Sequence, residues 1–206
     1  MSEALCKKCR YLGEKLFLKG EKCYTPKCLL VRKGIALRGK KRKRKGTTFY
    51  GKQLLEKQKL KLAYGLREKQ LKRYFELALK DKTSTPEALA QLLERRFDNI
   101  VFRLGLASNR RSARQLISHG HFLLNDRRHN IPSTLLKVGD IIKIRPQSLQ
   151  KPPFKDLREK LKNYQTPSFL AFDKEKLEGK VISLPNLEEL QLPFDFPLVV
   201  EFFSRK

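Results

Sequence analysis

The stretch from Ser108 to Asp126, SNRRSARQLISHGHFLLND, restricts the structure of this chain more than any other part. Ser108 or Asn109 can cap the start of a helix, and Gly120 stands where a left-handed C-cap residue belongs. Between these ends, apolar residues recur at i, i+3 and i+4, namely Ala113, Leu116 and Ile117. The stretch therefore predicts a short helix with one buried face, followed by a strand over residues 121–125.

The other face of this helix carries cations and an amide, from Arg110, Arg111, Arg114 and Gln115. Arginine binds phosphate through two parallel hydrogen bonds and stacks on bases. A solvated basic face usually contains interspersed carboxylates, and residues 108–125 contain none. We therefore interpret this face as a contact surface for nucleic acid.

The charge of the whole chain supports a polyanionic partner. Its 47 Lys and Arg against 21 Asp and Glu give a formal net charge of +26, which is costly without a countercharge. We expect no membrane contact, because no apolar run approaches the ~18–20 residues of a membrane span. The N-terminus also lacks the apolar core of a signal peptide, so we expect a cytoplasmic protein.

All four cysteines lie near the N-terminus, with the spacing Cys6-x2-Cys9 and Cys23-x4-Cys28. Two close pairs separated by a loop allow four thiolates to surround one ion, as in structural zinc sites. A disulfide framework is disfavoured in a reducing cytosol, and four unrelated cysteines would not cluster in this way. We predict one structural zinc ion; an iron–sulfur cluster uses the same ligands and is the less favoured alternative.

Periodicity and composition predict an α+β chain in four parts. These are a zinc-binding segment with a basic arm (1–45), a helical domain (46–88), a module with a small antiparallel sheet that contains the arginine helix (89–150), and a C-terminal tail that we expect to pack on the other domains (151–206). One helix is expected from Thr85 to a stop at Gly105, after an earlier helix break at Tyr64-Gly65. Strands are expected over 140–145, 180–184 and 198–203, and a helix over 156–164.

The basic arm has its highest charge over residues 40–45, where we predict contacts to RNA by Lys40, Lys41, Arg42, Lys43, Arg44 and Lys45. Gly34-x4-Gly39-Lys40 superficially matches a phosphate-binding loop, but Lys41 replaces the Ser or Thr that binds magnesium. The histidines lack the spacing of a zinc protease, and no Ser-His-Asp order is found. We therefore expect no enzymatic activity.

Two runs, ERRFDNIVFRLG at 94–105 and SNRRSARQLI at 108–117, followed by His119-Gly120-His121, carry a family resemblance. They resemble the RNA-binding module named after small-ribosomal-subunit protein S-four, which also occurs in pseudouridine synthases, tyrosyl-tRNA synthetases and heat-shock RNA binders. The flanking runs FLKGEKCYTPKC (17–28), LEKQKL (55–60) and VVEFFSR (199–205) resemble the bacterial ribosomal family itself. The resemblance covers nearly the whole chain.

This resemblance implies a protein that binds small-subunit ribosomal RNA at a multi-helix junction and starts assembly of the subunit body. It also implies contacts to neighbouring ribosomal proteins and to messenger RNA where it enters the ribosome, with an effect on translational accuracy. The implied RNA-binding residues are those of the arginine helix with His119, Gly120 and His121. We also predict RNA contacts by Lys57 and Lys59. The four cysteines match the zinc-binding members.

The chain departs from the family pattern at two places. The basic run between Gly34 and Gly46 replaces the usual Pro-Gly-Gln-His-Gly loop, and Asn125-Asp126 replaces the usual Asn-Gly turn. Because Asp tolerates a positive φ less well than Gly, we expect a strained hairpin or another turn type.

Two rival functions are an RNA-modifying enzyme that uses the module for delivery and a freestanding RNA chaperone.

Overall fold

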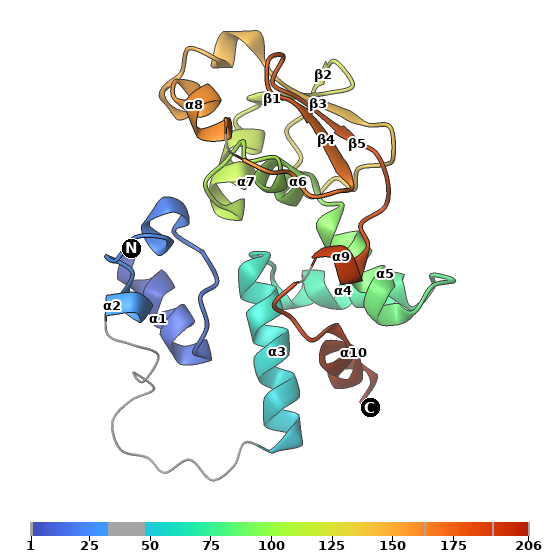
Figure 1. Cartoon of the computed structure of the whole chain (residues 1–206). Helices are drawn as coiled ribbons and strands as arrows, with labels where there is room; N and C mark the ends of the chain where they lie inside the picture. The colour runs from blue at the N-terminus through green and yellow to red at the C-terminus, as the bar shows by residue number, and fades with distance from the viewer. Residues whose placement is uncertain (1, 33–47, 163, 191, 206) are drawn as a thin grey trace. The chain divides into compact units, whose positions relative to one another are not determined.

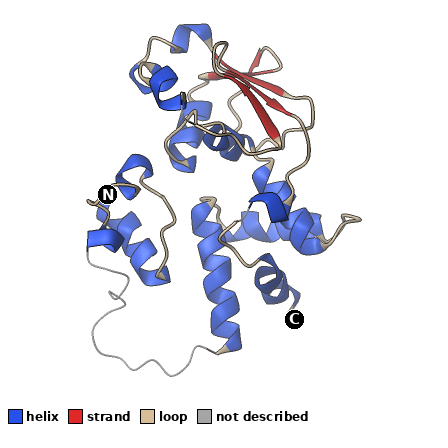
Figure 2. Ribbon diagram, viewed as in Figure 1, coloured by secondary structure: helices blue, strands red, loops and turns tan. Residues whose placement is uncertain are grey.

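The computed structural model describes residues 2–32, 48–162, 164–190 and 192–205. The chain divides into two compact units, one from residues 1–89 and 193–206 and the other from residues 90–192. Figures 1 and 2 show helices in both units and a sheet in the second. The boundaries predicted at 45, 88 and 150 stay predictions, and the predicted tail over 151–206 contributes to both units. Within the described ranges, no helix has the length and apolarity to cross a membrane.

The first unit is built from helices: α1 (Ser2–Leu12), a 3-10 turn (Gly20–Cys23), α2 (Leu29–Arg32), α3 (Phe49–Ala63), α4 (Glu68–Ala78), the start of α5 (Thr85–Glu94) and α10 (Phe196–Ser204). The hydroxyl of Thr48 caps α3 by accepting a hydrogen bond from the amide of Gly51 at 3.2 Å. Helix α3 ends before Gly65, whose φ is +62°, as the sequence predicted. Leu60, Leu71 and Phe75 are buried between α3, α4 and their neighbours.

The strand predicted over residues 198–203 is wrong, because these residues form helix α10. The run of Leu, Val and Phe favours a strand by propensity, but the carboxylate of Asp195 accepts a hydrogen bond from the amide of Leu198 and caps a helix. Helix α10 packs on α3 and α4. Its Phe196 and Val199 are fully buried, and Phe203 stacks on Phe75 with the ring centroids 5.1 Å apart. Tertiary packing at helical spacing therefore outweighs strand propensity here.

The second unit combines helices with one antiparallel sheet. Its elements are the end of α5, α6 (Phe97–Arg103), α7 (Arg110–Ser118), β1 (Phe122–Leu124), β2 (Arg127–Arg128), β3 (Ile141–Ile144), α8 (Leu157–Leu161), β4 (Leu170–Asp173), β5 (Glu178–Val181) and α9 (Leu187–Leu190), with 3-10 turns at Pro146–Ser148 and Pro152–Phe154. The strand order is β2-β1-β3-β5-β4. The strands expected over 121–125 and 140–145 are confirmed as β1 and β3. The one expected over 180–184 is β5, which lies slightly earlier, and β4 was not predicted.

The single helix predicted from Thr85 to Gly105 is also wrong, because it is interrupted between α5 and α6. The amide of Phe97 donates to the carbonyl of Thr134, and the amide of Leu136 donates to the carbonyl of Arg95, each at 2.9 Å. These bonds to a distant loop replace the helical ladder at the interruption. The apolar residues of both helices are nonetheless mostly buried: Leu92 is half-buried, and Leu89, Leu93, Phe97, Ile100, Val101 and Leu104 are fully buried.

The turn between β1 and β2 has positive φ values at both central residues, +50° at Asn125 and +62° at Asp126. This pattern is that of a type I′ turn, which suits the twist of a two-residue hairpin. The side-chain oxygen of Asn125 accepts a hydrogen bond from the amide of Ile141 at 2.9 Å, which holds the turn against β3. The hairpin therefore has a turn that needs positive φ values at both central residues, and the expected strain falls on Asp126.

Candidate functional site

The arginine helix has the boundaries that its sequence predicts. The side chain of Asn109 accepts a hydrogen bond from the amide of Ser112 at 2.8 Å and caps α7. Gly120 follows the helix with a φ of +71°, in the left-handed region of a C-cap. The predicted inner face is buried, with Ala113 and Ile117 both at 0% exposure. The polar face of α7 is therefore held in one orientation by its packing on the core of the second unit.

Two arginines share the buried carboxylate of Asp98, whose side chain is only 2% exposed. Arg96 donates from Nε to Oδ1 at 3.0 Å and from Nη2 to Oδ2 at 2.8 Å, which forms a two-pronged pair. Arg114 donates from Nε and Nη2 to Oδ2, at 3.0 Å and 2.7 Å. Asp98 is therefore an ion-pair partner of both Arg96 and Arg114.

Glu94 lies at the centre of a second cluster, in which one carboxylate again meets two arginines. The side chain of Glu94 is 0% exposed. Its carboxylate accepts two hydrogen bonds from Arg103 at 3.0 Å and one from the side-chain Nδ2 of Asn99 at 2.8 Å. Arg110 donates from Nε to the side-chain oxygen of Asn99 at 2.7 Å, and its guanidinium lies over the ring of Phe102 at 4.7 Å. Arg110 is therefore engaged within the protein on several sides.

The four predicted contact residues of α7 thus have different surroundings. Arg111 and Gln115 are exposed, and no partner for Arg111 occurs within the part of the chain that the structure describes. The side chain of Arg114 keeps 35% exposure beside Asp98, and that of Arg110 keeps 15% beside Glu94. Sequence periodicity placed all four side chains on one face but could not distinguish those that also make internal contacts.

The residues around Gly120 differ in the same way. His119 is exposed, whereas His121 is 8% exposed, with its Nδ1 2.9 Å from the hydroxyl of Ser148. Burial lowers the pKa of His121, and the charges of Lys151, His119 and Arg145 lower it further. His121 is therefore held inside the fold beside a polar partner, and His119 is the more accessible of the two.

Arg128 on β2 is an exposed cation beside α7 that the sequence reading missed. A Cβ atom added at Gly120 would lie 2.5 Å from its Nε, so its guanidinium rests directly against the glycine backbone. The predicted turn at residues 125–126 contained the necessary signal, because a tight hairpin brings the two residues after the turn back along β1. Arg127 and Arg128 are those residues.

Lys57 and Lys59 on α3 both face other side chains of the first unit. The ammonium of Lys57 lies 2.6 Å from Oε1 of Glu68, and its side chain is 8% exposed. The ammonium of Lys59 lies 2.6 Å from Glu56 and 3.1 Å from Glu14. We therefore interpret Lys57 and Lys59 as residues that stabilise the first unit. The predicted contacts at residues 40–45 lie outside the described residues.

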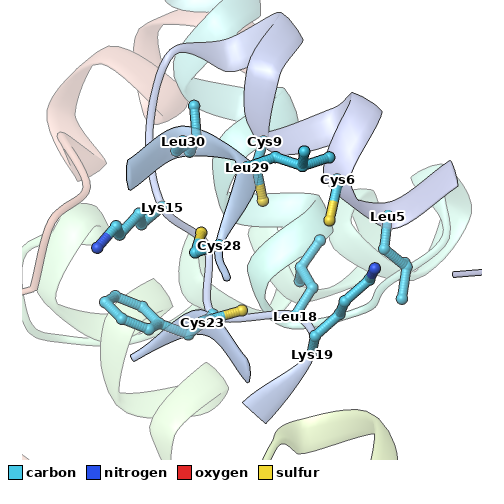
Figure 3. A pocket seen from close by; sticks show the side chains of 11 residues that line it. Leu5, Cys6, Cys9, Lys15, Leu18, Lys19, Cys23, Cys28, Leu29 and Leu30 are labelled. Atoms are coloured by element: carbon cyan, nitrogen blue, oxygen red, sulfur yellow. The ribbon is translucent and has the colours of Figure 1, made fainter. Parts of the chain in front are cut away.

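The four cysteines meet at one pocket although they come from separate elements (Figure 3). Cys6 and Cys9 lie one turn apart on α1, Cys23 ends the 3-10 turn, and Cys28 directly precedes α2. Burial raises the pKa of the Cys9 and Cys23 thiols, and the neighbouring thiols raise it further. Among the described residues, no group of three or more Cys, His, Asp or Glu side chains has metal-binding geometry. The pocket thus gathers four thiols without the closed arrangement of a finished metal site.

Comparisons with known proteins cover nearly the whole chain. Residues 2–94 match the family described as "Ribosomal protein S4/S9 N-terminal domain", and residues 95–142 match the "S4 domain". The chain is 46% identical to small ribosomal subunit protein uS4 of Acetivibrio thermocellus, with 98% of this chain and 97% of that protein aligned. It is 48% identical to the uS4 of Caldicellulosiruptor bescii, over 97% of this chain and 96% of the relative.

Proposed function

Since this chain belongs to the family of small ribosomal subunit protein uS4, we propose that it serves as a structural constituent of the small ribosomal subunit that binds its ribosomal RNA. It is a non-enzymatic protein of cytoplasmic ribosomes. The rival reading as an RNA-modifying enzyme requires a catalytic domain, and the family matches and full-length relatives account for the chain without one.

The observation that carries the RNA-binding assignment is the orientation of α7. Its apolar face is fully packed, so Arg111, Gln115 and the partly exposed Arg114 are presented together on a rigid surface. Arg128 adds a further cation beside the C-terminal end of this helix. RNA duplexes are recognised mainly through phosphates, 2′-hydroxyls and shape, and such a surface supplies the donors that this recognition needs.

RNA binding can be tested with the full chain and a transcript of small-subunit ribosomal RNA. The dissociation constant should rise ~10³–10⁵-fold between 50 and 200 mM salt if ~6–10 phosphates are contacted. Arg111→Ala should weaken binding by about tenfold. Arg158→Ala is a matched control, because it removes an exposed arginine of the same unit from α8. Equal effects of the two variants would reject α7 as the contact surface.

We further propose the finer roles that the family resemblance implies. These are binding at a multi-helix junction early in assembly, contacts to neighbouring ribosomal proteins and to messenger RNA where it enters the ribosome, and a contribution to translational accuracy. Sedimentation of cell extracts with mass spectrometry tests the main alternative. A freestanding RNA chaperone would be found mostly away from small subunits, whereas a ribosomal constituent sediments with them.

A structural zinc ion held by Cys6, Cys9, Cys23 and Cys28 also belongs to this proposal. It is supported by the convergence of the four thiols on one pocket and by the preference of zinc for four thiolate ligands. When bound, the ion would cross-link α1 to the chain around Cys23 and Cys28, a segment too small for a large core of its own. Lys15 and Lys19 line the same pocket and would offset the negative charge of the thiolates.

Metal analysis of protein purified without chelator should find about one zinc per chain. Cys9→Ser should lower this content and destabilise the N-terminal segment, as measured by hydrogen exchange of residues 5–30. An iron–sulfur cluster would instead give visible absorption and iron in the same preparation. If the purified protein contained no metal and its hydrogen exchange did not change when zinc was added, both the zinc site and the iron–sulfur cluster would be excluded.

A further inference from the structure

Tyr24 has the most exposed large hydrophobic side chain in the described part of the chain, at 70%. Its ring stacks on the half-buried ring of Phe17, with the centroids 4.9 Å apart and the planes at 27°. Phe17 also lines the pocket of the four cysteines. Tyr24 therefore forms the outer layer of an aromatic stack, and the packing around that pocket supports the inner layer.

Local hydrogen bonds fix the loop that carries Tyr24. The amide of Tyr24 donates to the carbonyl of Glu21 at 3.0 Å. The hydroxyl of Thr25 donates to the carbonyl of Lys22 at 3.1 Å. Phe17 has a φ of +49°, a left-handed conformation that costs free energy for a bulky residue and that recurs at functional sites. The orientation of the two rings is thus set before any partner binds.

The surface around this aromatic stack is basic. Lys22 and Lys27 lie two and three positions from Tyr24 in the sequence, and both are exposed. Residues 17–28 contain Lys19 as a further lysine and Glu21 as their one acidic residue. Lysine binds phosphate as a point charge, and a flat exposed ring offers a surface on which a base can stack. The stack and the lysines therefore match the two parts of a nucleotide.

A fixed and exposed ring of this kind selects unpaired nucleotides. In a duplex the faces of the bases are covered by their neighbours, so an aromatic side chain stacks on bases of loops, bulges and strand ends. A single exposed aromatic residue is by itself common. Tyr11 is one, at 62% exposure, since no ring stacks on it within the described residues. Tyr24 differs because its ring is ordered in advance and loses less freedom on binding.

We propose that Tyr24 is a stacking site for an unpaired base of small-subunit ribosomal RNA, with Lys22 and Lys27 binding the phosphates on either side of that base. This inference rests on the RNA-binding function proposed above. It adds a site in the first unit, whereas α7 belongs to the second. Every base has a flat face, so the site recognises an unpaired nucleotide by shape and charge and does not read its sequence.

The test measures binding of the full chain to a transcript of small-subunit ribosomal RNA. Tyr24→Ala should weaken binding by about tenfold, within the range for the loss of one base stack. Tyr24→Phe keeps the ring and should stay within about twofold of wild type, whereas Tyr24→Leu, which is apolar but not flat, should resemble Tyr24→Ala. Tyr11→Ala is the matched control from the same unit. Equal affinities of Tyr24→Ala and Tyr11→Ala, or of Tyr24→Ala and Tyr24→Phe, would overturn the inference.

Salt dependence separates the ring from the lysines. Lys22→Ala and Lys27→Ala should each reduce the slope of log affinity against log salt by about 0.7, the contribution of one phosphate of a single strand. Tyr24→Ala should leave this slope unchanged, because stacking on a neutral ring releases no counter-ions. A slope reduced by Tyr24→Ala as much as by Lys22→Ala would indicate lost phosphate contacts and would contradict stacking.

A tryptophan at position 24 gives a direct signal and covers the case in which Tyr24→Ala does not fold. The chain contains no tryptophan, so Tyr24→Trp carries a single indole fluorophore. Bases stack on indole as they do on tyrosine, and such stacking quenches its emission. The transcript should therefore quench Tyr24→Trp and leave Tyr11→Trp nearly unchanged. If the wild-type protein failed to bind the transcript, the proposed function itself would be rejected. Normal wild-type binding without quenching at position 24 would reject only this inference, even if the signal changed in intact small subunits through a neighbouring protein.

Discussion

The ammonium of Lys57 lies 4.0 Å from the ring centroid of Phe202, which joins the middle of α3 to the C-terminal helix α10. The same ammonium is 2.6 Å from the carboxylate of Glu68, so one side chain ties α10, α3 and the start of α4 together. A cation held over an aromatic ring and away from solvent has a larger effect than one at an exposed site. Lys57 is thus part of the internal structure of the first unit.

Replacing Lys57 by Met should therefore lower the free energy of unfolding by about 1–2 kcal/mol. Methionine keeps most of the apolar stem of Lys57, so the loss of stability comes from the cation–π contact and from the ion pair. The contribution of the ion pair is small because the side chain of Glu68 is 47% exposed. Urea unfolding measures the change. RNA affinity should stay within about twofold of wild type, and a large drop in affinity at unchanged stability would instead make Lys57 an RNA contact.

Replacing Arg114 by Ala should lower both stability and RNA affinity. The variant removes one of the two arginines that pair with the buried carboxylate of Asp98 and leaves its pair with Arg96, at a cost of about 1–3 kcal/mol. Arg111→Ala, at an exposed position, should change stability by less than about 0.5 kcal/mol. Thermal unfolding of the two variants side by side measures this contrast, and equal melting temperatures would contradict the structural role of Arg114.

The stability of the second unit should depend on pH through His121. Burial and nearby positive charges lower the pKa of this histidine below its ordinary value of 6.5. The unfolded chain therefore binds the proton more tightly, so stability is complete above about pH 6.5 and falls as the pH drops toward the folded pKa. Melting temperatures measured from about pH 8 to about pH 5 should show this fall. His121→Gln should flatten the curve, and an unchanged pH dependence in that variant would contradict the role of His121.

Replacing Asp126 by Gly should stabilise the hairpin between β1 and β2. The φ of +62° at this position is strained for Asp and relaxed for Gly. The substitution removes the ion pair between Asp126 and Lys143, which contributes little because the side chain of Asp126 is exposed. Lys143 keeps its ion pair with Glu178 at 3.3 Å. The net gain should be about 0.3–1 kcal/mol. Chemical denaturation measures it, and Asp126→Ala, which keeps the strain and loses the ion pair, should be less stable than wild type.

Replacing Gly179 by Ala should destabilise the second unit by about 1–3 kcal/mol. A Cβ atom at this position on β5 would approach the side chain of Leu104 more closely than real contacts allow. The cause is steric, so Leu104→Val should recover part of the loss when combined with Gly179→Ala. Additive losses in the double variant, measured by urea unfolding, would contradict direct contact between the two positions.

Local signals account for the elements that the sequence predicted correctly. The cap at Asn109, the left-handed Gly120 and the break before Gly65 depend on residues within about four positions of one another. The inner face of α7 follows from helical periodicity in the same way. The gathering of four cysteines into one pocket was also predictable, because their spacing makes convergence the simplest explanation.

Other features were decided by contacts between distant parts of the chain. Hydrogen bonds to residues 134–136 interrupt the helix predicted from Thr85 to Gly105, and packing on α3 and α4 makes residues 198–203 helical. Neither interaction leaves a periodic signal in the sequence.

The arginine face shows the same division within one element. The sequence by itself determined that Arg110, Arg111 and Arg114 lie on one side of a helix, because side-chain direction follows from 3.6 residues per turn. Only the tertiary structure decided that Arg110 and Arg114 meet buried carboxylates while Arg111 lies exposed. The physical reason is that an ion pair forms where folding brings opposite charges together away from water. The arrangement of α5, α6 and α7 in the folded unit decides where this happens, and the sequence of any one of these helices does not.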